Sequence, residues 1–433
     1  MSDIVPRVGA FGTGDGDERV SRRPPTANEG EDVSTEGTIA TDPGLIGPVL
    51  DEGFLAGDPF PHLARLRVEA PVAYAADPGA WVLARHADVT MAARDPATFC
   101  SGRGILLSEI GTTYDTPPTM MHTDPPAHTR YRRLVQPAFS PPVMRALETA
   151  IRERAAGAVA DLPAGEPVDV VAELAVPFPL RVISDLLGVP EDDWPRFYEW
   201  SEAAIPGATD WPEERIVELM GEMVTYLLAT AGERRAEPRD DVISLLATVE
   251  VDGDRLDDTE LAMFLVQLLV AGNETTRNAL SGGLVAFADD PAQWARLQAD
   301  RGLVDPAVEE VLRWTTPVVY FMRTTTREVE AGGRTIPAGA PVVLHYLSAN
   351  RDEAEFGPTA GAFDIARSPN HHVAFGSGPH FCLGAALARI ELRAMLDALA
   401  GRFASVTPAG PVERSMSLVI AGVRRAPLVL AEG

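Results

Sequence analysis

One cysteine lies in a setting that favours its anionic form. Cys382 stands in the glycine-rich segment FGSGPHFCLG, residues 375–384, and an apolar helical run begins directly after it at Ala385. Backbone N–H groups of such a loop point toward the sulfur, and the start of a helix carries partial positive charge, so a thiolate is favoured. A thiolate of this kind suits a haem iron, where its electron donation promotes cleavage of an O–O bond.

The same segment matches a family pattern at every defined position. Phe375, Gly378, His380, Cys382 and Gly384 fit F-x-x-G-x-H-x-C-x-G, so the segment resembles the haem-binding loop of cytochromes P450. This resemblance implies that Cys382 ligates the iron of haem b (iron protoporphyrin IX). The alternatives are a buried structural cysteine and a Cys–His hydrolase with His380 as its base. Neither alternative requires a phenylalanine and two glycines at those offsets.

An acid and an alcohol interrupt a long apolar helical pattern over residues 257–287, whose middle reads LLVAGNETT. Polar groups inside a buried helix are costly unless they have a task. Thr275 is predicted to hydrogen-bond the Ala271 carbonyl and bend the helix, and Gly272 to allow a close approach to the backbone. The segment resembles the family's oxygen-activation motif A-G-x-[DE]-T-[ST]. By that resemblance Ala271 contacts the cofactor, Thr275 hydrogen-bonds dioxygen and Glu274 relays protons; a kinked helix with a satisfied threonine is the alternative.

A second acid stands near an arginine on another predicted helix. Glu310 and Arg313 are three residues apart, where a carboxylate and a guanidinium can pair, although such a pair is often only a solvated surface contact. The spacing resembles the family's E-x-x-R motif, which implies a structural role around the cysteine loop. Many members place a third basic residue directly before a later Phe-Asp pair. Here an alanine precedes that pair, so the third cation is absent or comes from elsewhere, for example Arg351.

The two propionates of haem need cationic or hydrogen-bonding partners, and four residues fit them by resemblance to the family's propionate-binding positions. His128 and Arg132 are four apart on a predicted helix, Arg323 follows an apolar run, and His380 lies two residues before the cysteine. For Arg132 alone the alternative is an ordinary surface charge.

Composition limits the partners. The net charge is −26, which argues against nucleic acid or an anionic membrane as a partner. All 37 residues counted as Lys+Arg are arginine, so every permanent side-chain cation is a guanidinium. Two cysteines cannot build a disulfide framework, so a reducing cytoplasm is expected. The sequence contains no signal peptide, membrane anchor, flavin motif or iron–sulfur motif. By resemblance to soluble bacterial members, we expect a monomer that takes electrons from a ferredoxin and its reductase, with Arg132, Arg133 and Arg389 as candidate contacts.

The expected fold class is mainly α (α+β), with a large helical part and a smaller β-rich part, which is the layout of the cytochrome P450 fold. Residues 1–42 are polar and aperiodic, so a disordered N-terminal tail is predicted before a single domain over 43–433. A hairpin is expected over 72–83, and Pro177 and Pro179 are expected to interrupt the helical pattern. Further strands are expected within 329–336 and over 341–344, and helices over 60–68, 130–139, 143–162, 168–174, 180–187, 193–204, 212–233, 240–250, 257–287, 291–298 and 305–314.

The substrate pocket is predicted by resemblance to be lined by apolar residues, so the ligand should be hydrophobic. The sequence of residues 271–279 is similar to that of bacterial members that oxidise sterols, terpenoids and branched lipids. This resemblance implies hydroxylation or epoxidation with O2. Tailoring of a polyketide or peptide natural product stays open, as does a non-catalytic haem-binding sensor, which would need no acid–alcohol pair. The candidate lining residues are Val266, Val270, Ala271, Val318, Val319, Phe321, Val419 and Ile420.

Overall fold

The computed structural model describes residues 43–433 except 52, 113–118, 206–208 and 210, so the predicted tail over 1–42 lies outside the described residues. The helices are α1 Pro43–Ile46, α2 Phe60–Glu69, α3 His86–Arg94, α4 Ala127–Val135, α5 Pro141–Ala160, α6 Pro177–Leu187, α7 Trp194–Ala203, α8 Glu213–Ala236, α9 Val242–Thr248, α10 Asp258–Asp289, α11 Pro291–Ala299, α12 Val304–Thr315, α13 Tyr346–Ala349, α14 Glu353–Phe356 and α15 Ala385–Arg402. The strands are β1 Val72–Ala75, β2 Ala80–Leu83, β3 Phe99–Cys100, β4 Pro167–Asp169, β5 Tyr320–Thr325, β6 Val329–Ala331, β7 Arg334–Ile336, β8 Pro341–His345, β9 Ser405–Pro408, β10 Glu413–Arg414, β11 Val423–Arg425 and β12 Pro427–Ala431.

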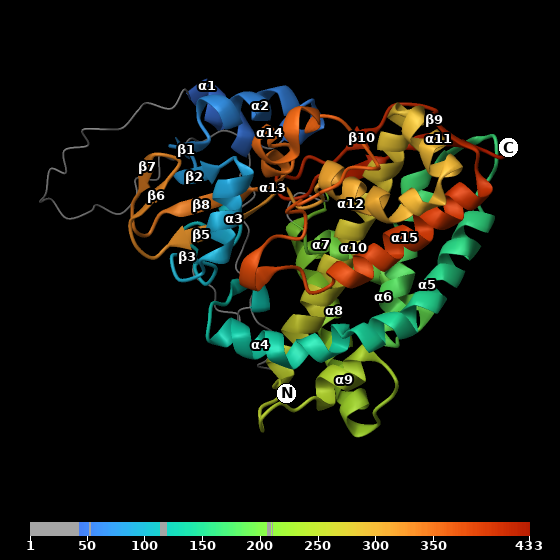
Figure 1. Cartoon of the computed structure of the whole chain (residues 1–433). Helices are drawn as coiled ribbons and strands as arrows, with labels where there is room; N and C mark the ends of the chain where they lie inside the picture. Colours follow the sequence, from blue (N-terminus) through green and yellow to red (C-terminus); the bar gives the residue numbers. More distant parts are fainter. Residues whose placement is uncertain (1–42, 52, 113–118, 206–208, 210) are drawn as a thin grey trace, which may run out of the picture.

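The strands β1, β2, β3, β5, β6, β7 and β8 gather on one side of the molecule and the long helices on the other, whereas β9 and β10 lie on the helical side (Figure 1). The large helical part and smaller β-rich part agree with the sequence prediction. The main sheet has the order β1-β2-β8-β5-β3. Its first two strands form the predicted antiparallel hairpin, in which Val72 faces Leu83, and β2 then pairs in parallel with β8. A smaller sheet joins β4, β12 and β9, and β6 and β7 form a separate hairpin. Within the described part of the chain, no helix combines the length and hydropathy needed to cross a bilayer.

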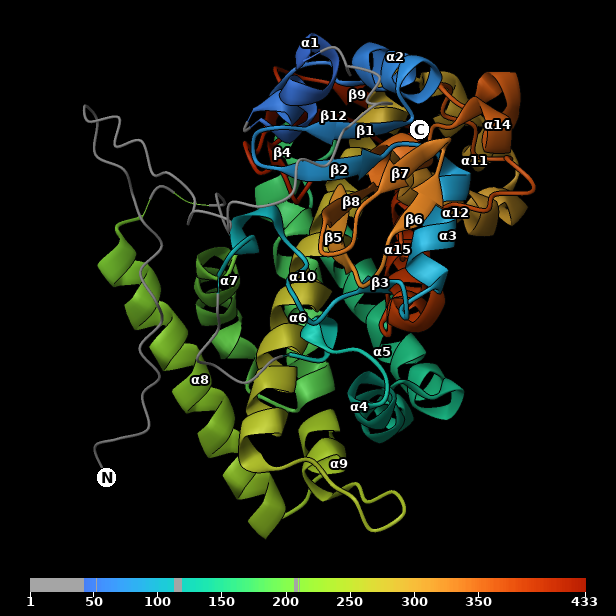
Figure 2. The same cartoon turned by 90° about the vertical axis from the view of Figure 1, so that its left-hand side faces the viewer.

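Helix α10 is the central element of the helical part (Figure 2) and contacts α6, α7, α8, α12 and α15. A capping box starts it: Asp257 accepts the Glu260 N–H at 2.8 Å, and Glu260 accepts the Asp257 N–H at 3.0 Å. Most residues from Leu261 onward are buried, because neighbouring helices cover nearly every face. The few positions of α10 that are not buried therefore mark where this helix faces something other than packed protein.

One sequence prediction was wrong near residue 170. The helix predicted over 168–174 begins instead as strand β4, which pairs with β12, followed by a helical turn over Val171–Ala175. Asp169 ends the strand, because its carboxylate accepts the N–H groups of both Val171 and Ala426 at 3.1 and 3.0 Å. The predicted break between two helical segments is present at Val176, and Pro177 and Pro179 lie in the first turn of α6 that follows it, where a missing N–H costs little.

The predicted pair on α12 is entirely buried and includes a third cation that the sequence analysis missed. Glu310 and Arg313 are both 0% exposed, and Arg313 donates to both Glu310 oxygens at 2.7 Å. Arg367 donates to the same carboxylate at 3.1 Å. Arg351 was the wrong candidate: it donates to the Trp314 carbonyl and stacks 3.7 Å above the Phe60 ring.

This buried network reaches the cysteine loop through one asparagine. Arg313 donates to the Asn350 carbonyl at 2.8 Å, and the Asn350 side-chain oxygen accepts the Val373 N–H at 2.7 Å. Val373 stands two residues before the loop. Glu310 also accepts the backbone N–H of Asp364 at 2.8 Å. The carboxylate therefore ties the irregular segment before the loop to α12.

Replacing Arg367 with alanine should lower the free energy of unfolding by about 3 kcal/mol or more, because it leaves part of a buried carboxylate uncompensated. Chemical denaturation of the purified protein measures this. The matched control is Arg296→Ala, which removes an exposed guanidinium that pairs with Asp364 and should cost less than about 1 kcal/mol. Equal losses in the two variants would contradict the importance assigned to the buried network.

Candidate active site

The cysteine loop is folded back on itself and held against α3. The Cys382 N–H donates to the Phe375 carbonyl at 2.9 Å, and the Phe381 N–H donates to the Gly378 carbonyl at 3.1 Å. Gly378 has a φ of +71°, and a Cβ there would lie 2.3 Å from the Ala93 carbonyl oxygen. Only glycine fits this position, so the family pattern here has a direct steric cause.

The sulfur lies just before α15, and the Gly384 N–H is directed at it as predicted. Cys382 is exposed, but the protein atoms packed around its sulfur raise the pKa of the thiol; the Gly384 N–H and the Arg132 guanidinium act in the opposite direction without reversing the shift. The loop N–H and the Arg132 guanidinium thus favour the thiolate, as expected, but burial of the sulfur opposes them. A metal cation bound to the sulfur would stabilise the thiolate.

The four residues predicted to bind propionates come together beside the loop. Helix α4 begins at Ala127, early enough to hold both His128 and Arg132, and the rings of His128 and His380 lie 4.0 Å apart. Arg132 donates to the Phe381 carbonyl at 2.6 Å. Burial and the charge of Arg323 lower the pKa of His380 to about 3, so this ring is neutral at physiological pH.

This cluster has the properties expected of a binding site for carboxylates. His128 is 2% exposed, and its Nε2 has no hydrogen-bond partner in the part of the chain that the structure describes. Arg323 is 5% exposed and donates to the Met322 carbonyl. Among the described residues, the hydrogen bonds of Arg132 and Arg323 go to backbone carbonyls and not to acids, and the nearby Asp124 is engaged by two backbone N–H groups. The buried Arg323, the half-buried Arg132 and the imidazole nitrogen of His128 without a partner fit the two propionates of haem.

Helix α10 contains the hydrogen bond that the sequence predicted between Thr275 and Ala271. The Thr275 hydroxyl donates to the Ala271 carbonyl at 2.8 Å. Ala271 is exposed although it lies in the middle of this largely buried helix, and Thr275 is half-buried. Gly272 does allow a close approach, since a Cβ there would lie 2.5 Å from the Ile183 side chain of α6. The glycine thus serves helix packing, and Ala271 marks the uncovered face.

Glu274 belongs to a buried network that the sequence analysis did not predict. It is 4% exposed, accepts from Asn278 at 2.8 Å and pairs with Arg277, which also donates to Glu202 of α7 at 2.8 Å. Burial raises the pKa of Glu274; the charge of Arg277 opposes this and that of Glu202 adds to it. The i, i+3 spacing could have indicated Arg277. No local pattern indicates Glu202, 72 residues earlier in the chain than Glu274.

Two segments predicted to line the substrate pocket lie next to each other. Val318 and Ile420 form an isolated antiparallel bridge, and the Val319 N–H donates to the Val419 carbonyl at 2.8 Å. Val319 and Ile420 are buried, while Val318 and Val270 are half-buried. Of the remaining candidates, Val266 is buried in the core and Phe321 is half-buried.

The three arginines suggested for redox-partner contact differ in their surroundings. Arg133 pairs with Asp252 at 3.0 Å, and Arg389 donates to Glu309 at 2.6 Å. Burial would raise the pKa of Glu309, but hydrogen bonds from Arg389 and His372 lower it to about 2, so this acid stays ionised. Arg133 and Arg389 are therefore neutralised by acids, whereas Arg132 is not in such a pair.

Comparisons with known proteins agree on one family. A cytochrome P450 family model matches residues 213–428. The chain is 39% identical over 388 residues to a methyl-branched lipid omega-hydroxylase of Mycobacterium tuberculosis, covering 84% of this chain and 89% of that protein. It is 35% identical over 391 residues to a steroid C26-monooxygenase of Mycolicibacterium smegmatis, covering 84% and 89%. The structure of cytochrome P450 CYP268A2 of Mycobacterium marinum in complex with pseudoionone matches with a TM-score of 0.80 at 37% identity, covering 87% of this chain and 96% of that chain.

The identities extend over most of each relative, and the structural match extends over most of both chains. These relatives favour a monooxygenase over the two alternatives from the sequence, a Cys–His hydrolase and a non-catalytic haem-binding sensor. The two arginines and two histidines beside the cysteine loop suit a group with two carboxylates, and this observation supports haem binding independently of the comparisons. This chain belongs to the cytochrome P450 family and is a haem-binding monooxygenase.

Proposed function

We propose that this monooxygenase hydroxylates a branched hydrophobic chain, as found in methyl-branched lipids, terpenoids or steroid side chains, near its end. The observation that carries this proposal is the 39% identity to the methyl-branched lipid omega-hydroxylase. The ω position of a lipid and C26 of a steroid both denote a terminal carbon of a branched alkyl chain. The apolar, half-buried residues Val270 and Val318 suit such a chain, because it offers few polar groups to recognise.

Five residues would hold the haem. Cys382 would be the protein ligand, and the cluster of His128, Arg132, Arg323 and His380 would bind the propionates. When bound, haem supplies the activation of dioxygen that allows one oxygen atom to enter an unreactive C–H bond. The protein would supply the positive charge and the hydrogen-bond donors that keep the group in one orientation.

Glu274 and Thr275 would manage protons on the α10 side of the site. Burial raises the pKa of Glu274, which favours the protonated form of this carboxyl. The Thr275 hydroxyl stands next in the chain and is half-buried. Glu274 would hold the proton and Thr275 would direct it to the exposed face beside Ala271.

Electrons would come from a ferredoxin and its reductase. Ferredoxins are acidic, and this chain carries a net charge of −26, so docking needs a local positive site. Since Arg132 is assigned to a propionate, the exposed Arg133 is the remaining surface candidate for docking, and its pair with Asp252 at 3.0 Å is itself an exposed one that a partner can replace.

Replacing Arg323 with alanine should speed the transfer of haem to apomyoglobin by about 10–100-fold, since a charge-assisted contact to a propionate is lost. The matched control is Arg133→Ala, because Arg133 is an exposed arginine that pairs with Asp252 and lies outside the cluster. The control should release haem at the wild-type rate. The same rate in both variants would show that Arg323 does not bind a propionate.

Replacing Cys382 with serine should abolish the strongly red-shifted Soret band of the reduced carbon-monoxide complex, because that band requires a thiolate ligand. The Cys100→Ser variant removes the other, buried cysteine and should keep the band. Retention of the red-shifted band in Cys382→Ser would overturn the assignment of the iron ligand.

Methyl-branched fatty acids and steroids with a branched side chain should shift the Soret band and yield terminally hydroxylated products with a ferredoxin and its reductase. Mass spectrometry of the products locates the new hydroxyl group. Macrolactones and carrier-bound peptides should give no shift, because the half-buried lining offers no polar groups at the positions of Val270 and Val318. Turnover of a macrolactone alone would favour the natural-product tailoring alternative.

A further inference from the structure

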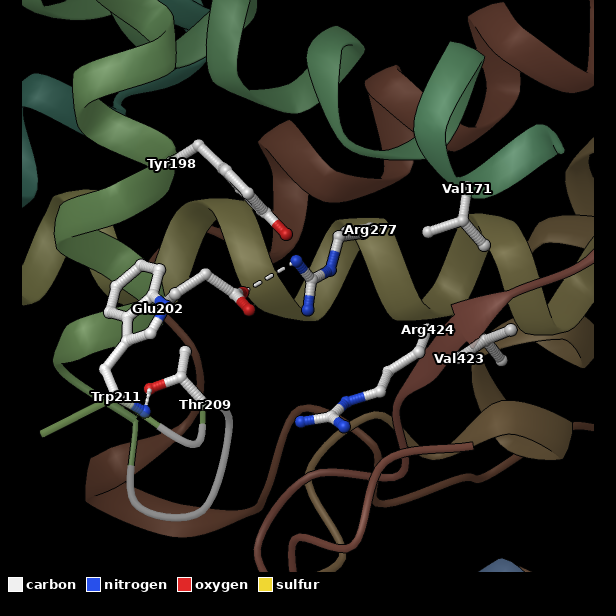
Figure 3. A pocket seen from close by; sticks show the side chains of 8 residues that line it. All are labelled: Val171, Tyr198, Glu202, Thr209, Trp211, Arg277, Val423 and Arg424. Atoms are coloured by element: carbon white, nitrogen blue, oxygen red, sulfur yellow. Dashed lines mark hydrogen bonds and ion pairs between the residues drawn. The ribbon is translucent and has the colours of Figure 1, made fainter. Parts of the chain in front are cut away.

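A pocket of about 390 Å³ lies beside α10 (Figure 3). Tyr198 and Glu202 come from α7, Arg277 from α10, and Val423 and Arg424 from β11. The pocket is open to solvent, and polar side chains form much of its wall. None of these residues has a task in the proposed function described so far.

One guanidinium connects the pocket to the buried acid of the active site. Arg277 and Glu202 both line the pocket, and Arg277 donates to Glu202 at 2.8 Å (Figure 3, dashed line). The same guanidinium pairs with Glu274, which lies next to Thr275 in the chain. Two carboxylates, one facing the pocket and one inside the protein, are thus bound by a single cation.

The network of Glu202, Glu274 and Arg277 can bind one additional proton, because it holds two acids and one cation. With both carboxyls ionised, Glu202, Glu274 and Arg277 would carry one net negative charge in a buried place, which is unfavourable. The groups facing them are the Tyr198 hydroxyl of α7 and, across the pocket, Arg424 of β11. A proton shared between the two carboxyls would make the three groups neutral together.

Two buried atoms of the network have no hydrogen-bond partner among the described residues: Oε2 of Glu274 and Nε of Arg277. One is an acceptor and the other a donor. Buried polar atoms are normally satisfied, by water where protein groups are absent. Water from the adjoining pocket would satisfy both and would complete a hydrogen-bonded path between the carboxyls.

We propose that protons reach Glu274 from this pocket through Glu202. The proposal rests on the role assigned above to Glu274. A hydronium ion in the pocket gives a proton to the Glu202 carboxylate and becomes water. Glu202 then gives its proton to a bridging water, which passes one of its own protons to Glu274, so Glu202 is a carboxylate again. Arg277 keeps its own proton throughout, because a guanidinium is not deprotonated in proteins, and it positions both acids.

A conservative change at Glu202 can test this path without disrupting α7. Asn273 of α10 donates to the Ser201 hydroxyl at 2.8 Å, so the two helices keep a second buried contact. The side-chain oxygen of Glu202→Gln can still accept from Arg277, but the amide cannot carry the proton. Glu199→Gln is a matched control, because Glu199 lies one turn earlier on α7 and pairs with Arg215 at the surface.

The first measurement is turnover of the haem-loaded enzyme with a substrate that shifts the Soret band. Glu202→Gln should form product roughly tenfold more slowly, with a larger solvent deuterium isotope effect and a greater share of electrons released as peroxide. Glu202→Asp should retain most of the wild-type rate, since it keeps a carboxylate at the pocket. Glu199→Gln should behave as the wild type.

The second measurement is an infrared pH titration of the Glu274 carboxyl band, identified by its loss in Glu274→Gln. The negative charge of Glu202 raises the pKa of Glu274, so its removal should lower that pKa. The protonated band should therefore disappear at a lower pH in Glu202→Gln than in the wild type, and at the wild-type pH in Glu199→Gln.

The outcomes separate this inference from the function on which it rests. If Glu274→Gln and Thr275→Ala release peroxide while Glu202→Gln keeps the wild-type rate and isotope effect, the pocket is not the proton entry. If Glu274→Gln itself stays fully coupled, the assigned role of Glu274 fails first. A slow Glu202→Asp with an unchanged infrared titration in Glu202→Gln would assign Glu202 a packing role alone.

Discussion

The active site depends on one carboxylate buried where water cannot reach it. Glu310 binds the guanidiniums of Arg313 and Arg367 and a backbone N–H, so its charge is compensated from several directions. These partners come from α12 and from the irregular segment that leads into the cysteine loop. Because a buried carboxylate left without its cations is strongly destabilising, the segment is held in one arrangement. The position of Cys382 is therefore set by an interaction that never touches its sulfur.

Arginine serves three different ends in the interior of this acidic protein. Around Glu310 it neutralises a structural charge. Beside His128, Arg132 and Arg323 bind backbone carbonyls and pair with no acid of the described residues, so they can bind the carboxylates of a bound group. On α10, Arg277 holds two acids at once. A guanidinium keeps its charge when it is buried, whereas an ammonium readily loses its proton there. The absence of lysine from the sequence is thus compatible with several buried cations.

The sequence predicted most helices and the cysteine loop, because apolar periodicity and steric requirements such as that of Gly378 are local. It did not predict contacts between distant segments. Arg367 was missed because a basic residue was expected before the Phe-Asp pair, whereas the guanidinium that reaches Glu310 comes from three residues after it. Strand β4 was read as helix because its pairing partner, β12, lies about 260 residues further along the chain. The thiolate of Cys382 stays a prediction for the iron-bound state, because burial raises the pKa of the free thiol while the Gly384 N–H and the nearby arginines lower it.

The hydrogen bond from Thr275 to Ala271 limits how this hydroxyl can meet any ligand. A hydroxyl has one proton to give, and here the Ala271 carbonyl takes it. While that bond persists, Thr275 can only accept, so a partner at the exposed face must be a donor. To donate instead, the hydroxyl must rotate away and leave a carbonyl in mid-helix with a vacant lone pair. When the Thr275 hydroxyl turns to donate to a ligand, the Ala271 carbonyl one turn away becomes free to accept from a water molecule. Ligand binding by Thr275 and water binding at Ala271 are therefore coupled.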